Sequence, residues 1–328
     1  MQKYSENAWL FYVEETADVP PVPVFLKIKK TMKIAVIIIS YNFHRWIDRC
    51  LGSLRLSTHP IDILVIDNGS QDDTVQILTQ NYPEVLLIQN HENLGFGHAN
   101  NIGMQWALQN GYDAVFLLNQ DAWIAPDTIE TLSYLITKYP QYGVISPVHL
   151  TGKGGKDLDH GFATYVGYRR KEMLPDEEIV TAAFINAAFW MIPTQVLRKI
   201  GGFSPLFYHY GEDKDFVNRL AFHNYLIGYS PLVTGCHDRE NRPASTERFF
   251  RGEQVYLLSE YVNINYSFPK AFGYAVLACC KKALLCTHPD KATKAARYMQ
   301  IARQLIALTP KVLKARKETR KTSPLYLQ

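Results

Sequence analysis

The sequence has few cysteines, and none of them lies in a disulfide or metal-binding pattern. Its five cysteines are an odd number, and no two form a CxxC pair. This argues against a disulfide framework and against a thiolate zinc site. We therefore expect a reducing, cytoplasmic location. The cysteines are Cys50, Cys236, Cys279, Cys280 and Cys286.

Long apolar runs are also missing. The best candidate for a membrane span, Ala271 to Cys286, is interrupted by Lys281 and Lys282, so we expect no transmembrane segment. Residues 1–31 contain acidic residues and prolines in place of the basic start and apolar stretch of a secretory signal. We expect them to form a poorly ordered extension, with Met32 as a second candidate start.

A strong net charge is the third missing feature. The formal charge is +4 over 328 residues, which gives no reason to expect binding to nucleic acid or to other polyanions. With 47% hydrophobic and 20% charged residues, the composition is that of a folded globular protein.

From Lys33 to about Pro147, apolar strands alternate with segments of helical spacing. The strand candidates are continuous runs rich in β-branched residues, as expected for strands that are buried on both faces. This alternation predicts an α/β fold with a mostly parallel sheet flanked by helices. The expected strands are Ile34 to Ile39, Ile61 to Ile66, Val85 to Ile88 and Ala114 to Leu118.

The second half of the chain is less regular. Residues 151–179 contain glycines among charged residues and predict a mobile loop. Order is expected again over Ala182 to Ile192, in a helix from Thr194 to Ile200 that Gly201-Gly202 ends, and in a helix from Asp213 to Asn224. From Glu247 onward the pattern is helical, and basic residues among apolar ones predict an amphipathic surface helix. Those basic residues are Lys281, Lys282, Lys291, Lys294, Arg297, Arg303, Lys311, Lys314, Arg316 and Lys317.

Polar residues follow each expected strand, at the edge where ligands bind in parallel sheets. Asp121 comes just after the fourth strand and is a candidate ligand for Mg²⁺ or Mn²⁺, which prefer oxygen. An Asp that ends a strand in an Asx-turn explains the same position. His237 follows the apolar segment Leu226 to Val233 and is a second candidate metal ligand, although a lone His is more often a solvated or core residue.

A group of acidic residues begins the expected helix at Asp213. Glu212, Asp213 and Asp215 lie where the helix dipole favours carboxylates, so capping alone would explain them. The functional alternative is a general base that takes the proton of an acceptor hydroxyl during displacement at a sugar's anomeric carbon.

Two further segments are candidates for nucleotide binding. Asp67, in Asp67-Asn68-Gly69-Ser70, can accept hydrogen bonds from a pyrimidine base, although the same residues are typical of a plain turn. The loop Asn93-Leu94-Gly95-Phe96-Gly97 leads into a helix start, where backbone N–H groups can bind phosphate. The loop lacks the third glycine of a dinucleotide fingerprint.

Taken in order, six motifs resemble those of the family 2 glycosyltransferases, in particular the rhamnosyltransferase-like branch. The resemblance covers about Lys33 to Ser245. The motifs are Ser40-Tyr41-Asn42, Asp67-Asn68-Gly69-Ser70, Asn93-x-Gly95-Phe96-x-x-Ala99-x-Asn101, Leu118-Asn119-x-Asp121, Gly201-Gly202-Phe203 and Gly211-Glu212-Asp213-x-Asp215.

The resemblance implies a GT-A fold, a divalent metal (Mn²⁺ or Mg²⁺) and an inverting reaction. It implies Asp213 as catalytic base with Glu212 beside it, and Asp121 and His237 at the metal. It also implies an acceptor pocket bordered by Asn186 to Met191, with Trp190 and Asp215 as acceptor residues, although Trp190 suits the core equally well. The implied nucleotide-binding residues are Ser40, Tyr41, Asn42, Asp67, Asn93, Gly95, Phe96, Asn101, Asn119 and Gln120.

One position departs from the family's DxD metal motif: the first Asp is Asn119 here, a neutral ligand. This departure leaves two other functions as alternatives. A sugar-1-phosphate nucleotidyltransferase should have a basic, glycine-rich loop after its first strand, and Ser40-Tyr41-Asn42 stands there instead. A non-catalytic sugar-nucleotide-binding partner in a glycan assembly complex would not need Asp121, Glu212, Asp213 and His237 together.

The sequence therefore predicts a transferase that moves a hexose or deoxyhexose from a UDP- or dTDP-sugar to a glycan or lipid-linked acceptor of a surface polysaccharide. The expected domains are an extension over 1–31, a GT-A domain over 32–245 and a basic helical extension over 246–328. That extension is a candidate peripheral contact with the inner face of an anionic membrane. A solvated helix packed on the catalytic domain or on a homodimer partner is the alternative.

Overall fold

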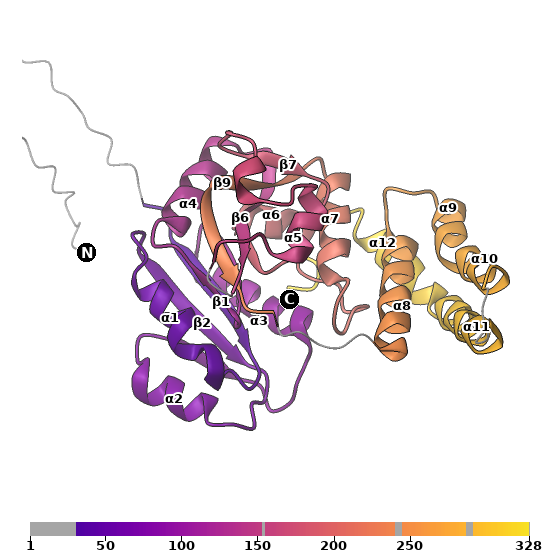
Figure 1. The fold of residues 1–328 in the computed structure, drawn as a ribbon, viewed down its shortest axis with the longest axis horizontal. Coiled ribbons are helices and arrows are strands. Elements are labelled where there is room, and N and C mark those ends of the chain that lie inside the picture. The colour runs from indigo at the N-terminus through magenta and orange to yellow at the C-terminus, as the bar shows by residue number, and fades with distance from the viewer. Residues whose placement is uncertain (1–30, 153–154, 240–244, 287–290, 328) are drawn as a thin grey trace, which may run out of the picture. The chain divides into compact units, whose positions relative to one another are not determined.

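The computed structural model describes residues 31–152, 155–239, 245–286 and 291–327. Residues 1–30, most of the expected N-terminal extension, lie outside these ranges. Figure 1 shows a twisted sheet with helices on both of its faces, followed by a group of helices, α8 to α12. The prediction of an α/β fold is confirmed.

The first four strands pair in parallel where the sequence predicts strands. They are β1 (Ile34–Ser40), β2 (Ile61–Asp67), β3 (Leu86–Gln89) and β4 (Ala114–Asn119). The other half of the sheet is mixed, because β8 (Phe189–Pro193) runs antiparallel to both β4 and β6 (Tyr142–Thr151). The sheet order is β3-β2-β1-β4-β8-β6-β9-β5, with β9 (Leu226–His237), β5 (Ala122–Ile124) and β7 (Val180–Ala182), which pairs with β9.

Alternate side chains of β1 belong to two separate cores, as expected for a strand covered on both faces. Ile34, Val36 and Ile38 pack with the first set of helices, and Ala35 and Ile37 pack with the second. The first set is α1 (Ile47–Arg55), which follows the 3₁₀ turn η1 (His44–Trp46), α2 (Thr74–Asn81) and α4 (Thr128–Lys138). The second set is α3 (Phe96–Gln109), α5 (His160–Val166), α6 (Thr194–Ile200) and α7 (Glu212–Phe222).

The segment 151–179, for which the sequence predicts a mobile loop, contains helix α5 and the 3₁₀ turn η2 (Lys171–Met173). Asp159 caps α5 by accepting a hydrogen bond from the Phe162 amide at 3.0 Å. The Phe162 side chain is buried, with its ring stacked 4.8 Å from that of His149. A cap and one buried aromatic side chain therefore order a segment that the sequence pattern leaves irregular.

The helices after residue 245 have a hydrophobic core of their own. Phe207, from the loop between α6 and α7, is part of this core together with Phe250 and Leu257. Among the described helices, none has the length and apolar content needed to cross a bilayer. The helices are α8 (Thr246–Val262), α9 (Phe268–Phe272), the π-helical turn η3 (Gly273–Leu277), α10 (Ala278–Leu284), α11 (Lys291–Ala307) and α12 (Thr309–Glu318).

Residues 323–327, which we call the C-terminal tail, return to the sheet region. The Ser323 amide donates a hydrogen bond to the Lys199 carbonyl at 3.0 Å, and the Gly202 amide donates one to the Leu325 carbonyl at 2.8 Å. Leu327 is buried in the same core as α3, α6 and α7. A Cβ at Gly201 would meet the Leu325 backbone. The two glycines therefore provide the space in which the tail lies.

Candidate active site

The carboxyl ends of β1, β2 and β4 meet at one edge of the sheet. Ser40 is paired with Asp67, and Ile39 is paired with Asn119. The residues that follow these strands are therefore neighbours, although they are far apart in the sequence. We call this edge the active rim.

Asp67 holds the turn that follows β2. Its carboxylate is buried and accepts hydrogen bonds from the hydroxyls of Ser40, at 3.0 Å, and Ser70. It also accepts from the backbone amides of Gly69 and Ser70, at 3.2 and 3.0 Å. These four donors match the roughly four lone-pair positions of a carboxylate. The plain-turn alternative thus describes Asp67 in this structure, and its contact with a nucleobase stays a prediction.

Tyr41 and Asn42 are held by side chains from the neighbouring turns. Gln120 accepts from the Tyr41 amide at 2.8 Å and donates to the Tyr41 carbonyl at 3.2 Å. Asn42 adopts a left-handed conformation, and its side chain accepts from the Gln71 amide at 2.9 Å. The Tyr41 ring is left 44% exposed. An aromatic side chain fixed at its backbone and open at the rim is suited to stacking with a planar ligand.

Asn68 is a residue of the site that the sequence reasoning did not single out. Its side chain accepts from the Leu94 amide at 3.2 Å and donates to the Asn93 side chain at 3.0 Å. Asn93 in turn accepts from the Gly95 amide at 3.0 Å. This chain of amides fixes the glycine loop on the turn after β2, and the signal for it was present in the Asp67-Asn68-Gly69-Ser70 motif.

The glycine loop ends at the first residue of α3. Gly95 has φ +83°, a conformation that favours glycine, and a Cβ there would meet the Tyr208 backbone. The Tyr208 hydroxyl also donates to the Asn93 carbonyl at 2.9 Å. The loop before α7 therefore lies directly on the loop before α3, next to backbone amides that can bind an anion.

Asn119, Asp121 and His237 form a polar group at the active rim. His237 Nε2 lies 3.2 Å from Asp121 Oδ1 and 3.4 Å from Asn119 Nδ2. Strand pairing brings them together, because β5 follows Asp121 directly and Ala122 pairs with His237. The structure thus joins three predicted site residues whose sequence positions span more than a hundred residues.

The donor set of this group suits a hard divalent cation. It offers one carboxylate, one imidazole whose Nε2 faces the carboxylate, and one amide whose oxygen, Asn119 Oδ1, is buried without a hydrogen-bond partner. Within the described residues, no three His, Cys, Asp or Glu side chains lie together in a way that could hold a metal ion. The present group has two such side chains, Asp121 and His237. Two such ligands are sufficient for a metal that shares its coordination with substrate phosphates.

Asp238 and Trp46 support this group, and the sequence reasoning missed both. The Asp238 amide donates to the Asp121 carbonyl at 2.8 Å. Its carboxylate accepts from the Trp46 indole at 3.1 Å. This links the end of β9 to η1 and holds the turn that carries Asp121.

Glu212 and Asp213, the first residues of α7, have different surroundings. Burial, with Asp213 beside it, raises the pKa of Glu212 to about 8. Its Oε2 has no partner, and a Cβ at Gly97 would touch its side chain. Asp213 is half-buried; burial raises its pKa, while the backbone amides of Lys214 and Ala187 counteract the rise. Burial therefore raises the pKa of both carboxyls, and the amides of two neighbouring residues oppose the rise at Asp213 alone.

One backbone segment connects Asp213 with the metal-type group. Ala187, whose amide acts on Asp213, precedes Ala188, whose carbonyl accepts from the Asn119 amide at 3.1 Å. Next in the chain, the Phe189 ring makes an edge contact with the His237 ring, with centroids 6.1 Å apart. Residues 187–189 thus touch the candidate base on one side and the candidate metal ligands on the other.

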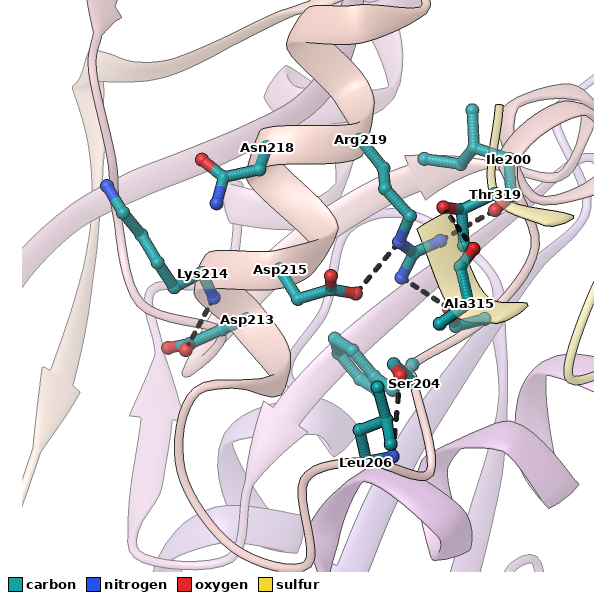
Figure 2. A network of polar contacts seen from close by, with 12 residues as sticks. Ile200, Ser204, Leu206, Asp213, Lys214, Asp215, Asn218, Arg219, Ala315 and Thr319 are labelled. Carbon is teal, nitrogen blue, oxygen red and sulfur yellow. Dashed lines mark hydrogen bonds and ion pairs between the residues drawn. The ribbon is translucent and has the colours of Figure 1, made fainter. Parts of the chain in front are cut away.

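Asp215, Trp190 and Asn101 lie away from the rim. Figure 2 shows Asp213 and Asp215 leaving α7 in different directions, with Asp215 pointing to Arg219. Arg219 pairs with Asp215 at 2.9 Å and donates to the carbonyls of Ile200 and Gly202, both at 2.6 Å. Trp190 is fully buried in the core, so the core alternative describes its position. The acceptor roles of Asp215 and Trp190 gain no support from this geometry.

Asn101 forms two hydrogen bonds to the backbone of Phe203. It accepts from the Phe203 amide at 2.7 Å and donates to its carbonyl at 2.9 Å. A Cβ at Gly202 would meet the Asn101 side chain. This explains physically why Asn101 and Gly201-Gly202-Phe203 occur together, and it gives Asn101 a structural role in α3, the helix that follows the glycine loop.

Comparisons with known proteins agree with this architecture. The family described as Glycosyl transferase family 2 matches residues 35–201. The N-acetylglucosaminyl-diphospho-decaprenol L-rhamnosyltransferase of Mycobacterium tuberculosis is 26% identical over 235 residues, which cover 63% of this chain and 76% of the relative.

Two solved structures have a similar fold. The mannosyltransferase PcManGT of Pyrobaculum calidifontis, in complex with GDP-Man and Mn²⁺, has a TM-score of 0.55 and 18% identity over 92% of this chain and 89% of its own. TarS of S. aureus, residues 1–349 in complex with UDP, has a TM-score of 0.52 and 16% identity over 88% of each chain. The chain is a glycosyltransferase of family 2 with the GT-A fold, and it is similar to the rhamnosyltransferase branch of that family.

Proposed function

We propose that this glycosyltransferase inverts the anomeric centre as it transfers a hexose or deoxyhexose from a UDP- or dTDP-sugar to a glycan or lipid-linked acceptor of a surface polysaccharide. The observation that carries the proposal is the position of residues 187–189, which contact Asp213 on one side and the Asn119–Asp121–His237 group on the other. In a direct displacement, the base and the leaving diphosphate lie on opposite sides of the reacting carbon. A candidate base and a candidate diphosphate site on the two sides of one segment suit that arrangement.

Asp213 is the proposed general base. It accepts the proton of the acceptor hydroxyl while the acceptor oxygen bonds to the anomeric carbon and the bond from that carbon to the nucleoside diphosphate breaks. The raised pKa of Asp213 strengthens it as a base. Glu212 is the less suitable candidate, because its pKa of about 8 keeps it protonated at neutral pH.

Asp121, His237 and the amide oxygen of Asn119 would hold the proposed Mn²⁺ or Mg²⁺. Such an ion, when bound, neutralises negative charge on the leaving diphosphate. The backbone amides at the start of α3 lie on the same edge of the sheet and can bind the remaining phosphate charge. Tyr41 is the proposed stacking partner of the nucleobase.

Replacing Asp213 with Asn tests the reaction. We expect Asp213→Asn to lower turnover by about 10²- to 10⁴-fold, with little change in donor affinity, because it removes the base and keeps the shape of the side chain. Donor consumption with Mn²⁺, together with calorimetric binding of UDP and dTDP, measures both quantities. Native turnover in the variant would refute the assignment and would favour the non-catalytic alternative.

Replacing Asp121 with Ala tests the metal site separately. We expect Asp121→Ala to abolish the Mn²⁺-dependent part of nucleotide binding, because it removes the only carboxylate of the group. Calorimetric titration of UDP or dTDP, with Mn²⁺ and with EDTA, provides the measurement. Asp62→Ala, at an exposed carboxylate of β2 far from the carboxyl end of the strand, is the control.

The proposed location is the cytoplasm, at the inner face of the membrane where lipid-linked acceptors are present. All five cysteines are free thiols, which suits a reducing compartment. The M. tuberculosis relative is named for a diphospho-decaprenol acceptor, which is a lipid. Contact of the basic C-terminal helices with an anionic membrane is the corresponding proposal, and homodimerisation is the alternative use of the same surface.

A further inference from the structure

Helices α9 and α10 form one amphipathic rod, joined by the π-helical turn η3. The residues at both junctions, including Gly273 and Ala278, have right-handed helical conformation, so the helical path is continuous from Phe268 to Leu284. Its inner face is a row of buried small and apolar residues in the C-terminal core. They are Ala271, Ala275, Val276, Cys279 and Ala283.

The outer face of this rod has apolar and basic side chains at intervals of three or four residues. Leu277, Leu284 and Leu285 are 57%, 80% and 65% exposed, and Tyr274 is 49% exposed. Exposed apolar side chains that lie on one helix face among basic residues are typical of an interaction surface. We call this face the Lys-Leu stripe. Its members are Lys270, Tyr274, Leu277, Lys281, Leu284 and Leu285.

The stripe lies in a region of strongly positive charge. Residues 246–318, which span α8 to α12, contain thirteen Lys or Arg and five Asp or Glu, which gives a net charge of +8. Because the whole chain carries +4, the remaining residues carry −4. The low overall charge thus conceals a separation of charge between the C-terminal helices and the rest of the chain.

Several basic side chains of this region already have acidic partners. Lys282 pairs with Glu253, and Arg297 pairs with Glu247. Within the described part of the chain, no acidic side chain forms an ion pair with Lys270 or Lys281, and Lys270 lies over the rings of Tyr266 and Tyr274. The positive charge of the stripe is therefore available to an external partner.

A second copy of the chain is a poor partner for this stripe. A two-fold interface places the same patch of both protomers face to face, so it would bring the lysines of one stripe against those of the other. An anionic bilayer offers phosphates for the lysines and acyl chains for the leucines at the same surface. Tyrosine is also typical of the boundary between headgroups and acyl chains.

We propose that the Lys-Leu stripe docks the enzyme on an anionic phospholipid bilayer. Leu277, Leu284 and Leu285 enter the boundary between headgroups and acyl chains, and Lys270 and Lys281 lie beside lipid phosphates. The proposal assigns membrane contact to the rod α9–α10 rather than to the basic residues of α11 and α12. Its connection with lipid-linked acceptors rests on the proposed function, whereas the docking itself does not.

The docked helices are in direct contact with the loop that leads to the candidate base. Leu206 and Phe207 of that loop pack into the core shared by α8 and the rod. A Cβ at Gly211, the residue before Glu212, would meet the Val255 side chain of α8. A bilayer bound to the stripe would therefore contact the same group of helices that packs against the start of α7.

Vesicle co-sedimentation of the full chain tests the proposal. Vesicles of phosphatidylcholine with and without phosphatidylglycerol are compared for the parent and for the triple variant Leu277→Ser, Leu284→Ser, Leu285→Ser. We expect the parent to prefer the anionic vesicles and to dissociate as salt is raised. We expect the triple variant to bind them at least about tenfold more weakly.

The matched control is Ile306→Ser with Leu313→Ser, which replaces exposed apolar residues of α11 and α12. We expect it to bind vesicles as the parent does. Equal binding by the parent and the triple variant, or an equal loss in the control, would overturn the proposal. The proposal would also be overturned if light scattering showed the parent to be a dimer and the triple variant to be a monomer, because the stripe would then be covered by a second copy.

Hydrolysis of soluble donor by the triple variant separates this proposal from the enzymatic one. We expect its rate to equal that of the parent, because the three leucines lie outside the active rim. Loss of vesicle binding with unchanged hydrolysis supports the docking role. Unchanged vesicle binding refutes that role whether or not the protein turns over donor.

Discussion

Two adjacent carboxyls at the start of α7 show how one residue's surroundings decide its chemistry. Glu212 is buried against Gly97 and has an unpartnered oxygen, whereas Asp213 is half-buried and has backbone amides beside it. A neutral Glu212 next to Asp213 spares the candidate base a second negative charge. The pair therefore suits one proton acceptor and one neutral neighbour.

Glu212→Gln tests this difference through the pH dependence of stability. The folded protein holds the Glu212 proton up to about pH 8, whereas the unfolded chain releases it near its ordinary pKa of 4.5. The stability of the parent therefore falls as pH rises through this window, and the variant, which has no such proton, avoids the loss. We expect the two proteins to be nearly equally stable near about pH 4, and the variant to be more stable by on the order of a few kcal/mol near about pH 8. Urea unfolding at both pH values provides the measurement, and a constant difference would contradict the assignment.

The sequence predicted the positions of the candidate site residues along the chain better than the directions of their side chains. Asp121, His237 and Asp213 followed from their positions after strands and at a helix start. Asp215 did not, because its direction depends on the face of α7 that packs inward. The sequence carried a signal for this as well, since Asp215 and Arg219 are four residues apart in a helix and can pair.

At the scale of elements, local patterns predicted the parallel half of the sheet and most helices. β1, β2 and β4 are mostly apolar runs, as expected for strands that are buried on both faces. The antiparallel strands β5, β7 and β8 depend on partners more than forty residues away in sequence. Pairing between such distant strands does not produce a recognisable pattern within a short stretch of sequence, so the mixed half of the sheet could not be predicted.

The C-terminal tail is the element whose position was least expected. Leu327 is buried among side chains of α3, α6 and α7, and a Cβ at Gly202 would meet it. We expect Leu327→Ala to lower the free energy of unfolding by about 2–4 kcal/mol, because it leaves a cavity in a close-packed core. Leu313→Ala, at a 45% exposed leucine of α12, should change it by less than about 0.5 kcal/mol. Equal effects in urea unfolding would show that the tail does not contribute to the core.

At the scale of the whole molecule, the C-terminal helices contact the sheet region at several places. They include the core that Phe207 shares with α8, the tail at Gly201-Gly202, and a hydrogen bond between His223 Nε2 and the Thr319 carbonyl at 2.9 Å. The sequence predicts a boundary near residue 245, and that boundary remains a prediction. Apolar side chains at the first two of these contacts would be exposed to water if the helices and the tail were absent.

A chain ending at Asn263 tests how far the two regions depend on each other. It keeps every candidate site residue and α8 but lacks α9 to α12 and the tail. We expect a lower melting temperature and a tendency to aggregate, because Val262, Leu257 and the space at Gly202 lose their packing partners. A truncated protein with the melting temperature of the parent would show instead that the sheet region folds independently.

The return of residues 323–327 to Gly201 and Gly202 has a consequence for synthesis on the ribosome. The core beside α6 and α7 lacks Leu327 until more than a hundred further residues have been translated. Assembly of the region that carries Glu212 and Asp213 is thus coupled to translation of the last helix and the segment after it. A product released early would therefore present an incompletely packed core around the candidate base.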